Sequence, residues 1–290
     1  MDLSIIIVSY NSADLICGCL DSILSAGCAE TEIFVVDNAS TDGSTSLIKE
    51  NYPAVHLTEN PANRGFAAAN NQVLQRCRGR YVLFLNPDTK VMPDTFRNAL
   101  SFMDANPSIG LAGTKIVNLD GSPQDSVSYR YPGQKYAKRE SLPTIGAIAC
   151  VLGASMIARR EILLDVGGFD EDFFLYGEDQ DLCLRIRRKG FEIGYIESAL
   201  VIHLGGRSER ETASTEVWKK KILAEAVFYR KHYLPETIDS IRKANLREAA
   251  FRLAILKLAV PFLGDKTQAR AKLAKYETFY ALHQRLITGG

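Results

Sequence analysis

Residues 3–105 alternate short apolar segments with amphipathic stretches, and this alternation constrains the fold more than any other feature of the chain. Segments rich in β-branched residues predict buried strands, and apolar residues at helical spacing predict the helices between them. We expect strands at Leu3–Ser9, Glu32–Val36, Val55–Thr58 and Tyr81–Leu85, and helices after Ser12 and at Asp42–Asn51, Phe66–Cys77 and Pro93–Ala105. Ser12 is the expected N-cap of the first helix. The pattern predicts an α/β fold with a mostly parallel sheet and helices on both faces.

After Gly110 the pattern changes. Residues 118–143 are rich in Gly, Pro, Ser and Tyr without periodicity, which predicts a long surface loop. An apolar stretch follows at 147–158, then a short arginine-rich helix at Gln180–Lys189, then a short apolar strand at Ala199–Ile202. From about Glu211 to Leu286 the chain is expected to be helical, with turns near Pro235 and at 261–264.

Composition excludes several classes of protein. The 290 residues are 46% hydrophobic and 24% charged, which is typical of a folded chain and not of a disordered one. The net charge of +1 provides no basic field for nucleic acid. The charge is uneven, however: residues 1–206 carry a balance of −7 and residues 207–290 a balance of +8. An acidic body with a basic tail suggests that the tail faces an anionic surface.

The six cysteines have no CxxC spacing and lie in apolar contexts, so we expect buried free thiols and no zinc site. The N-terminus lacks a basic region and a cleavage site, and no apolar stretch is long enough to span a bilayer. We therefore expect a cytoplasmic protein, with peripheral contact at the inner face of the membrane left open.

Polar and acidic residues follow three of the predicted strands, at the edge of the sheet where α/β proteins bind ligands. They are Ser9-Tyr10-Asn11, the segment 37–43 and Asn86-Pro87-Asp88. Taken alone, the second segment can also be a helix-entry loop with Ser40 or Asp42 as N-cap, and the third can be a β-turn that leads into a helix. Neither a GxGxxG sequence nor a Walker A sequence is present, which argues against a dinucleotide oxidoreductase and a P-loop NTPase.

Six segments, in order, resemble the glycosyltransferases of family 2, with the GT-A (nucleotide-diphospho-sugar transferase) fold, close to the bacterial rhamnosyltransferase-like branch. The segments are SIIIVSYNS at 4–12, VVDNASTDGS at 35–44, NPANRGFAAANN at 60–71, FLNPDT at 84–89, GGFDEDFFLYGEDQDLCLR at 167–185 and HLGGRS at 203–208. The resemblance implies a GT-A catalytic domain at 1–208, with a nucleotide-binding half at 1–110 and an acceptor-binding half at 111–208. Residues 209–290 would form a helical C-terminal extension.

The resemblance also implies the residues that bind the nucleotide sugar. Asp37 would accept the N3–H of a uracil or thymine ring, a charge-assisted hydrogen bond. The same cleft would be lined by Ser9, Tyr10, Asn11, Asn38, Ser40, Asp42 and Asn86. Asn63, Arg64 and Gly65 would approach the nucleotide, with Gly65 allowing close contact because it has no Cβ. A surface cation is the alternative for Arg64.

A divalent metal is implied as well. The family's metal motif is Asp-x-Asp, whereas this chain has Asn86-Pro87-Asp88. One carboxylate, Asp88, together with the donor's two phosphates suits Mg²⁺ or Mn²⁺. His203 follows the short apolar strand and is the second expected metal ligand; its imidazole suits Mn²⁺ better than Mg²⁺.

Glu178 and Asp179 lie in the segment that such enzymes use to bind and deprotonate the acceptor. The resemblance implies that Asp179 is the catalytic base and that Glu178 holds the acceptor or orients the loop. Carboxylates are also favoured at a helix N-terminus, and the two roles are compatible. The run Arg185, Arg187, Arg188 and Lys189 is interpreted as a solvated face at the end of that helix.

Together these residues imply an inverting, metal-dependent glycosyltransferase, with dTDP-L-rhamnose as the favoured donor and a glycan or lipid-linked glycan as acceptor, in bacterial surface polysaccharide synthesis. UDP- and GDP-hexose donors stay open. So does a non-catalytic nucleotide-binding scaffold; a sugar nucleotidyltransferase is disfavoured because Ser9–Ser12 is not a Gly-rich, Arg-containing loop. The basic tail, with its interrupted apolar segment Leu246–Leu263, is expected either to lie against an anionic membrane or to pack on the catalytic domain or a second subunit.

Overall fold

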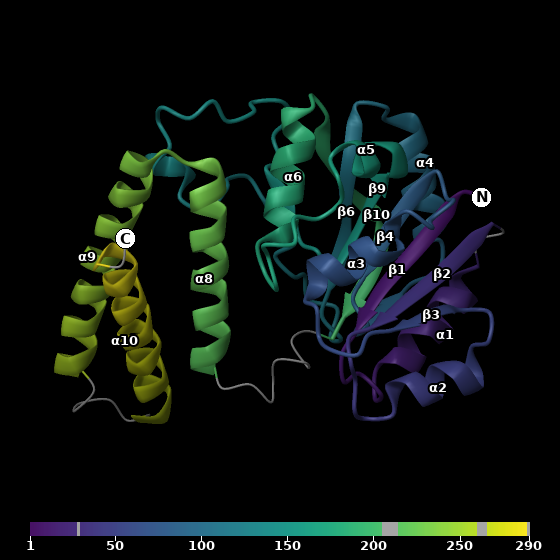
Figure 1. Ribbon diagram of the computed structural model, residues 1–290, viewed down its shortest axis with the longest axis horizontal. Coiled ribbons are helices and arrows are strands. Elements are labelled where there is room, and N and C mark those ends of the chain that lie inside the picture. Colours follow the sequence, from purple (N-terminus) through teal and green to yellow (C-terminus); the bar gives the residue numbers. More distant parts are fainter. Residues whose placement is uncertain (28–29, 205–213, 260–265, 289–290) are drawn as a thin grey trace. The chain divides into compact units, whose positions relative to one another are not determined.

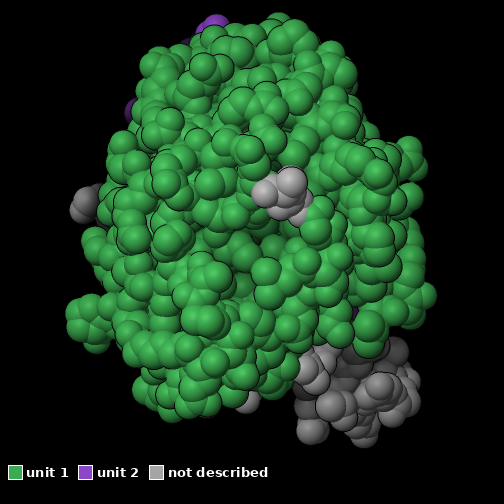
Figure 2. Space-filling model, turned by 90° about the vertical axis from the view of Figure 1, so that its right-hand side faces the viewer, with its two compact units in different colours: residues 1–131, 142–208 green, residues 132–141, 209–290 purple. Residues whose placement is uncertain are grey.

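The computed structural model describes residues 1–27, 30–204, 214–259 and 266–288. The chain divides into two compact units, one of residues 1–131 and 142–208, the other of residues 132–141 and 209–290 (Figures 1 and 2). The expected boundary between residues 208 and 209 lies outside the described residues.

The first unit is built on an eight-stranded sheet with the order β3-β2-β1-β4-β9-β6-β10-β5. Its strands are β1 (Leu3–Ser9), β2 (Thr31–Asp37), β3 (His56–Glu59), β4 (Tyr81–Leu85), β5 (Thr89–Val91), β6 (Ile109–Val117), β9 (Ser155–Arg159) and β10 (Glu192–His203). The first four strands are parallel to one another, whereas β9 is antiparallel to both of its neighbours. A separate two-stranded ladder joins β7 (Val127–Ser128) to β8 (Cys150–Val151). The predicted α/β sheet is confirmed.

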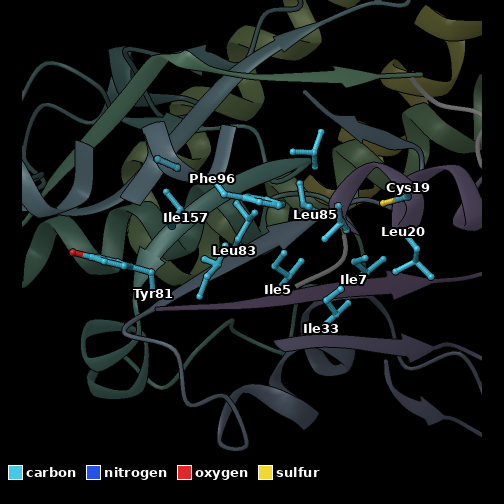
Figure 3. Packing of buried hydrophobic residues seen from close by; sticks show 14 of the residues in the cluster. Ile5, Ile7, Cys19, Leu20, Ile33, Tyr81, Leu83, Leu85, Phe96 and Ile157 are labelled. Atoms are coloured by element: carbon cyan, nitrogen blue, oxygen red, sulfur yellow. The ribbon is translucent and has the colours of Figure 1, made fainter. Parts of the chain in front are cut away.

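Helices cover both faces of this sheet. One face packs on α1 (Ile16–Ala26), α2 (Ser44–Asn51) and α4 (Thr95–Ala105), and the main hydrophobic cluster lies there (Figure 3). Ile5, Ile7 and Leu83 point into that cluster because alternate residues of a strand face the same side. On the other side, Phe84 meets Phe169 at 4.9 Å between ring centroids, and Phe169 also contacts Phe66, the first residue of α3 (Phe66–Leu74). The remaining helices are α5 (Arg160–Asp165) and α6 (Glu178–Arg188).

Strand β6 was not expected from the sequence, and it contains two glycines, Gly110 and Gly113. A Cβ on Gly113 would lie 2.8 Å from Cβ of Val151, and a Cβ on Gly110 would lie 2.8 Å from a methyl group of Ile186. The glycines therefore allow β8 and α6 to approach the strand closely.

The expected cap of the first helix is wrong. Helix α1 begins at Ile16, and its N-terminal flanking residue Leu15 makes no side-chain capping bond. The Ser12 hydroxyl instead lies 2.6 Å from the Ser9 hydroxyl, and its backbone N–H donates to Ser44 Oγ at 3.1 Å. Ser12 thus forms its hydrogen bonds within the loops at the carboxyl edge of the sheet. The described cysteines are free, as expected, and Cys28 lies outside the described residues.

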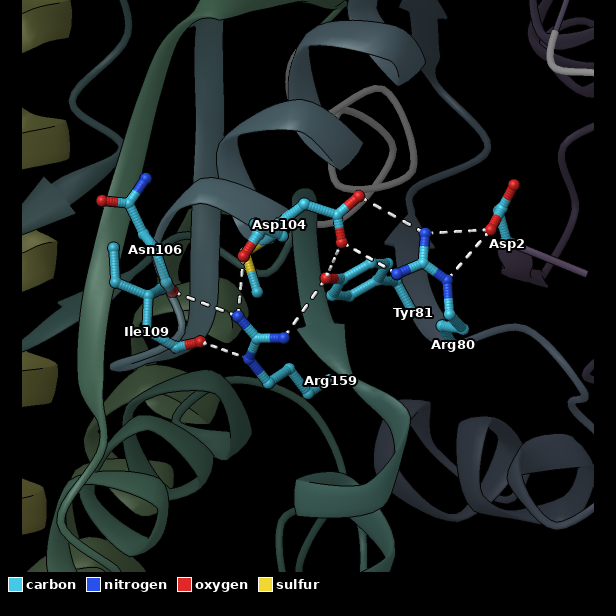
Figure 4. Close-up of polar contacts among 8 residues, drawn as sticks. Asp2, Arg80, Tyr81, Asp104, Asn106, Ile109 and Arg159 are labelled. Atoms are coloured by element: carbon cyan, nitrogen blue, oxygen red, sulfur yellow. Dashed lines mark hydrogen bonds and ion pairs between the residues drawn. The ribbon is translucent and has the colours of Figure 1, made fainter.

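Polar contacts tie together the amino edge of the sheet (Figure 4). The Arg159 guanidinium donates to the backbone oxygens of Ile109 at 2.9 Å and Met103 at 2.7 Å, and to the Tyr81 hydroxyl at 3.2 Å. Arg80 bridges Asp2 and Asp104 beside them. These contacts fix the ends of β4 and β9 and lie at the edge opposite the polar strand ends.

The second unit holds the helical C-terminal extension: α8 (Ser214–His232), α9 (Pro235–Ala259) and α10 (Lys266–Thr288). Residues 132–141, from the expected surface loop, also belong to it and contain the short helix η1 (Gln134–Tyr136). The Tyr233 hydroxyl donates to the Pro132 oxygen at 2.6 Å, and the Leu234 N–H donates to a Glu140 carboxylate oxygen at 3.0 Å. The expected turn near Pro235 is confirmed, whereas residues 261–264 lie outside the described residues. None of the helices in the described ranges combines the length and apolar character needed to cross a bilayer.

Candidate active site

The loops after β1 and β2 are joined by hydrogen bonds at the carboxyl edge of the sheet. The Asn11 N–H donates to Ser40 Oγ at 2.8 Å, and Asn11 Oδ1 accepts from the Thr41 N–H at 2.9 Å. Asp42 accepts from the Ala13 N–H at 2.8 Å and also from the Ser44 N–H at 3.1 Å, so its carboxylate holds the loops and the start of α2. Asn11 has a positive φ, of 48°. Asn11, Ser40 and Asp42 thus shape the edge of the cleft.

Asp37, the last residue of β2, places a carboxylate at this edge of the sheet. Its side chain is buried, and Oδ2 accepts from the Ser40 N–H at 2.9 Å. Oδ1 is also buried and has no hydrogen-bond partner among the described residues. A buried acceptor without a donor is costly, which suits it to a ligand N–H. Nearby, Tyr10 is 46% exposed.

Asn38 and Gly65 connect the loop after β2 to the start of α3. The Asn38 amide donates to the Gly65 oxygen at 3.0 Å, and its oxygen accepts from Asn60 at 2.9 Å. Gly65 has φ of +83°, and a Cβ there would lie 2.5 Å from the backbone oxygen of Phe174. The glycine is therefore required by contact with the segment before α6, a reason different from the expected approach to nucleotide. Asn63 Oδ1 accepts from the Gly65 N–H at 2.9 Å, and the Arg64 side chain is exposed.

The sheet register brings Asp88 and His203 together. Strands β5 and β10 pair antiparallel, with His203 opposite Thr89. The Leu204 N–H donates to the backbone oxygen of Asp88 at 2.9 Å. The Asp88 Oδ1 and His203 Nε2 atoms are 3.2 Å apart, and both side chains are largely buried. Two residues separated by more than one hundred positions and expected to share a metal are neighbours. Residues 205–208 of the same sequence segment lie outside the described residues.

This pair fits a divalent cation. Neighbouring ligands of an octahedral ion with bonds of about 2.1 Å lie about 3 Å apart, and the observed separation is 3.2 Å. A carboxylate oxygen and an imidazole nitrogen at this distance need either a hydrogen atom or a metal ion between them, because both atoms otherwise present lone pairs to each other. No group of three or more His, Cys, Asp or Glu side chains suited to a metal occurs in the described ranges, so a metal here would take its other ligands from water and a bound phosphate.

Glu178 and Asp179 begin α6, after a turn in which Tyr176 and Gly177 have positive φ. Asp179 Oδ2 accepts from the Gly153 N–H at 3.0 Å, and burial raises the Asp179 pKa. Glu178 Oε2 is buried without a hydrogen-bond partner among the described residues. Burial, and then the charge of Asp179, raise the Glu178 pKa to about 8, so this carboxyl is mostly protonated at neutral pH.

A short backbone segment links the pair Asp88–His203 to the pair Glu178–Asp179. The Ala154 oxygen accepts from the Asn86 N–H at 3.0 Å, and the preceding residue, Gly153, donates to Asp179. The turn that carries Asp88 is therefore two hydrogen bonds away from the carboxylate of Asp179.

The expected solvated face on α6 is wrong for two of its arginines. Arg187 is 6% exposed and donates to the Ile145 oxygen at 2.6 Å and the Tyr131 hydroxyl at 3.2 Å. Arg185 pairs with buried Asp181 at 2.7 Å. Arg187 lies three and four positions after the buried Leu184 and Cys183, and this helical spacing is the signal that could have revealed it. Arg188 and Lys189 are exposed, as expected.

Two polar contacts of the site were not expected from the sequence. Gly153 holds Asp179 through its backbone, which no side-chain pattern reveals. Gln124 lies 2.9 Å from His203 Nδ1, and it comes from a stretch without periodicity.

Comparisons with known proteins agree with this architecture. The model of glycosyl transferase family 2 matches residues 4–167. The chain is 27% identical over 231 residues to N-acetylglucosaminyl-diphospho-decaprenol L-rhamnosyltransferase of Mycobacterium tuberculosis, covering 69% of this chain and 75% of that protein. It is 32% identical over 126 residues to the putative teichuronic acid biosynthesis glycosyltransferase TuaG of Bacillus subtilis, covering 42% of this chain and 50% of that protein.

Solved structures share the fold. The mannosyltransferase PcManGT from Pyrobaculum calidifontis, solved with GDP-Man and Mn²⁺, matches with a TM-score of 0.61 at 23% identity over 98% of this chain and 84% of its own. Residues 1–349 of S. aureus TarS match with a TM-score of 0.59 at 18% identity over all of this chain and 92% of that one. The family model covers more than half of the chain, and the fold and the ordered strand-end segments agree with it. The chain belongs to glycosyl transferase family 2.

Proposed function

We propose that this glycosyltransferase is inverting and metal-dependent, and that it moves L-rhamnose from dTDP-L-rhamnose to a glycan or lipid-linked glycan in bacterial surface polysaccharide synthesis. The relative from M. tuberculosis supports L-rhamnose as the transferred sugar and a lipid-linked acceptor, since its name describes an L-rhamnosyltransferase acting on N-acetylglucosaminyl-diphospho-decaprenol. PcManGT, solved with Mn²⁺, supports a divalent metal.

The observation that carries the proposal is the contact between Asp88 Oδ1 and His203 Nε2 at 3.2 Å. It joins one carboxylate and one imidazole at the carboxyl edge of β4, next to the loops where family members receive the donor. A metal ion held there supplies charge neutralisation for the departing diphosphate. Asp37 lies at the end of β2 and offers its free Oδ1 to a ring N–H of the base.

The acceptor side needs a base. A sugar hydroxyl is a weak nucleophile at neutral pH, so a carboxylate must accept its proton as it attacks the anomeric carbon. We assign this task to Asp179, which the Gly153 N–H holds in place. Burial and the charge of Asp179 raise the Glu178 pKa, so Glu178 in its protonated form can hold the acceptor by donating a hydrogen bond.

Thermal-shift measurements with dTDP, UDP and GDP, each with Mn²⁺ or Mg²⁺, test the donor assignment. A ligand that binds only the folded protein raises its melting temperature. We expect the largest shift with dTDP and Mn²⁺, and release of dTDP from dTDP-L-rhamnose as the activity. A shift with one of the nucleotides, without any release of nucleoside diphosphate, would instead support a non-catalytic nucleotide-binding scaffold.

UDP- and GDP-hexoses are the second candidate donors. PcManGT was solved with GDP-Man, and TarS with UDP-GlcNAc. Asp37 does not discriminate, because uracil, thymine and guanine all carry a ring N–H. The same thermal-shift series distinguishes them by the nucleotide that gives the largest shift.

We also propose that residues 1–208 act as the catalytic domain, with a nucleotide-binding half at 1–110 and an acceptor-binding half at 111–208. The extension 209–290 would attach the cytoplasmic enzyme to the inner face of the membrane or to a second copy. Exposed Phe251, Ile255 and Leu258 recur at helical spacing on α9, with Arg252 and Lys257 between them. Flotation with vesicles containing anionic lipid tests the membrane, and light scattering tests the dimer.

A further inference from the structure

Gln124 makes three contacts that fix the direction of its amide. Its Nε2 donates to the backbone oxygen of His203 at 2.8 Å and to Asn118 Oδ1 at 2.7 Å. Its Oε1 lies 2.9 Å from His203 Nδ1. A backbone oxygen accepts and never donates, so the group beside it must be the amide nitrogen. The amide oxygen therefore faces the imidazole.

The direction of the amide determines the state of the imidazole. Because Gln124 Oε1 is an acceptor only, His203 Nδ1 must carry a proton to make this hydrogen bond. In the neutral ring the lone pair is then on Nε2, the atom that faces Asp88 Oδ1 at 3.2 Å. This is the tautomer that a ligand needs when it binds a metal through Nε2.

Gln124 also restrains the backbone that carries the ring. The side-chain amide of Gln124 contacts both the backbone oxygen and the imidazole of His203. It therefore restrains the orientation of the ring relative to the backbone of the same residue. Asn118 holds Gln124 from behind, because Asn118 Oδ1 accepts from Gln124 Nε2 at 2.7 Å, and Asn118 Nδ2 in turn donates to Ser122 Oγ at 2.9 Å. Gln124 thus acts on the ring at the atom opposite Asp88.

We propose that Gln124 is a positioning residue of the metal site, which holds His203 in the Nδ1–H tautomer and aims Nε2 at the ion beside Asp88. This inference rests on the metal dependence in the proposed function. Losing such a partner of a metal-ligating histidine weakens metal affinity by about 10–100-fold. The residue itself touches neither the donor nor the ion.

The test measures Mn²⁺ affinity by the loss of the free-ion EPR signal, with whichever of dTDP, UDP and GDP stabilises the wild-type protein. Gln124→Met keeps length and removes both hydrogen-bonding atoms, and we expect Mn²⁺ binding about 10–100-fold weaker. Leu119→Ala is the matched control in the same loop, and its Mn²⁺ affinity should stay within about 2-fold of wild type, since the Leu119 side chain is 73% exposed.

A double-mutant cycle separates positioning from general damage to the loop. If Gln124 acts through His203, then Gln124→Met should add no further loss of Mn²⁺ affinity in a His203→Ala background. The same loss in both backgrounds would overturn the proposal, and so would wild-type affinity in Gln124→Met. Should Gln124→Met fail to fold, Gln124→Ala provides the same cycle with a smaller side chain. A wild-type protein that binds no Mn²⁺ would contradict the proposed metal site itself.

Discussion

Two pairs of side chains at the same edge of the sheet are built in different ways. Asp88 faces the imidazole of His203, a group able to share a cation with it. Asp179 is held by a backbone N–H and lies beside Glu178, a buried carboxyl whose pKa is raised to about 8. The first pair is suited to hold positive charge, and the second is suited to hold and accept protons.

On the proposed assignment, the two pairs divide two tasks of glycosyl transfer between them. Charge neutralisation of the leaving diphosphate needs ligands that share a cation, whereas deprotonation of the acceptor needs a carboxylate whose neighbour is neutral. The backbone of Gly153–Ala154 accepts from the Asn86 N–H on one side and donates to Asp179 on the other. It fixes the two pairs relative to each other without a contact between their side chains. Changes in one pair should therefore leave the task of the other intact.

The largest expected effect is on turnover. Asp179→Asn keeps the shape and the acceptor toward the Gly153 N–H but removes the basicity, so turnover should fall by about 10²–10⁴-fold. Nucleotide and Mn²⁺ affinity should not change. Steady-state release of nucleoside diphosphate in the presence of acceptor measures the loss. Near-normal turnover in this variant, together with an inactive Glu178→Gln enzyme, would assign the base to Glu178 instead.

The next effect concerns the metal. Asp88→Ala should weaken Mn²⁺ binding by at least about 100-fold, more than the loss of an outer-shell partner costs. His203→Ala should have a smaller effect in the same EPR titration. Asp94→Ala, which alters an exposed carboxylate after β5, is the matched control. Unchanged Mn²⁺ affinity in Asp88→Ala would exclude Asp88 as a ligand.

A third prediction tests the contact between the loop before α3 and the segment before α6. Gly65→Ala adds a Cβ 2.5 Å from the Phe174 oxygen at a φ of +83°, so the free energy of unfolding should fall by about 1–3 kcal/mol. Urea denaturation measures this. Gly43→Ala is the control, because its φ is also positive while a Cβ there meets nothing within 4 Å. Equal losses in both variants would attribute the effect to the backbone angle alone.

The last prediction concerns the pH dependence of stability. The Glu178 pKa in the folded protein, about 8, lies above its ordinary 4.5. The stability that Glu178 contributes is complete below pH 4.5 and is lost as the pH rises through 8. Glu178→Gln mimics the protonated form, so its melting temperature should gain on that of wild type across this interval. A constant difference between pH 5 and 9 would contradict the raised pKa.

Much of the first unit was predictable because periodicity reports burial. Strand β1 lies where its apolar pattern predicts it, and the start of α6 lies two residues before the predicted Gln180. The pattern failed where a residue's role depends on a distant neighbour. Gly113 is needed for its contact with Val151, and Ser12 bonds Ser9 and Ser44 in place of a helix end.

The candidate site divides in the same way. Asp37, Asp88, Asp179 and His203 stand in sequence segments that resemble the family, so they could be named before their geometry was known. Gln124 could not, because its partner His203 lies 79 positions away and nothing near Gln124 in the sequence points to it. The sequence predicted an exposed side chain for Arg187, because its partners, the Tyr131 hydroxyl and the Ile145 oxygen, come from a distant part of the chain.

The separation of tasks is tested most directly by isothermal titration calorimetry of the nucleoside diphosphate, with and without Mn²⁺, on Asp88→Ala and Asp179→Asn side by side. We expect Mn²⁺ to strengthen nucleotide binding to wild type and to Asp179→Asn equally, and to have almost no effect on binding to Asp88→Ala. Mn²⁺-dependent binding that survives in Asp88→Ala, or that disappears in Asp179→Asn, would contradict the assignment of the two pairs to separate tasks.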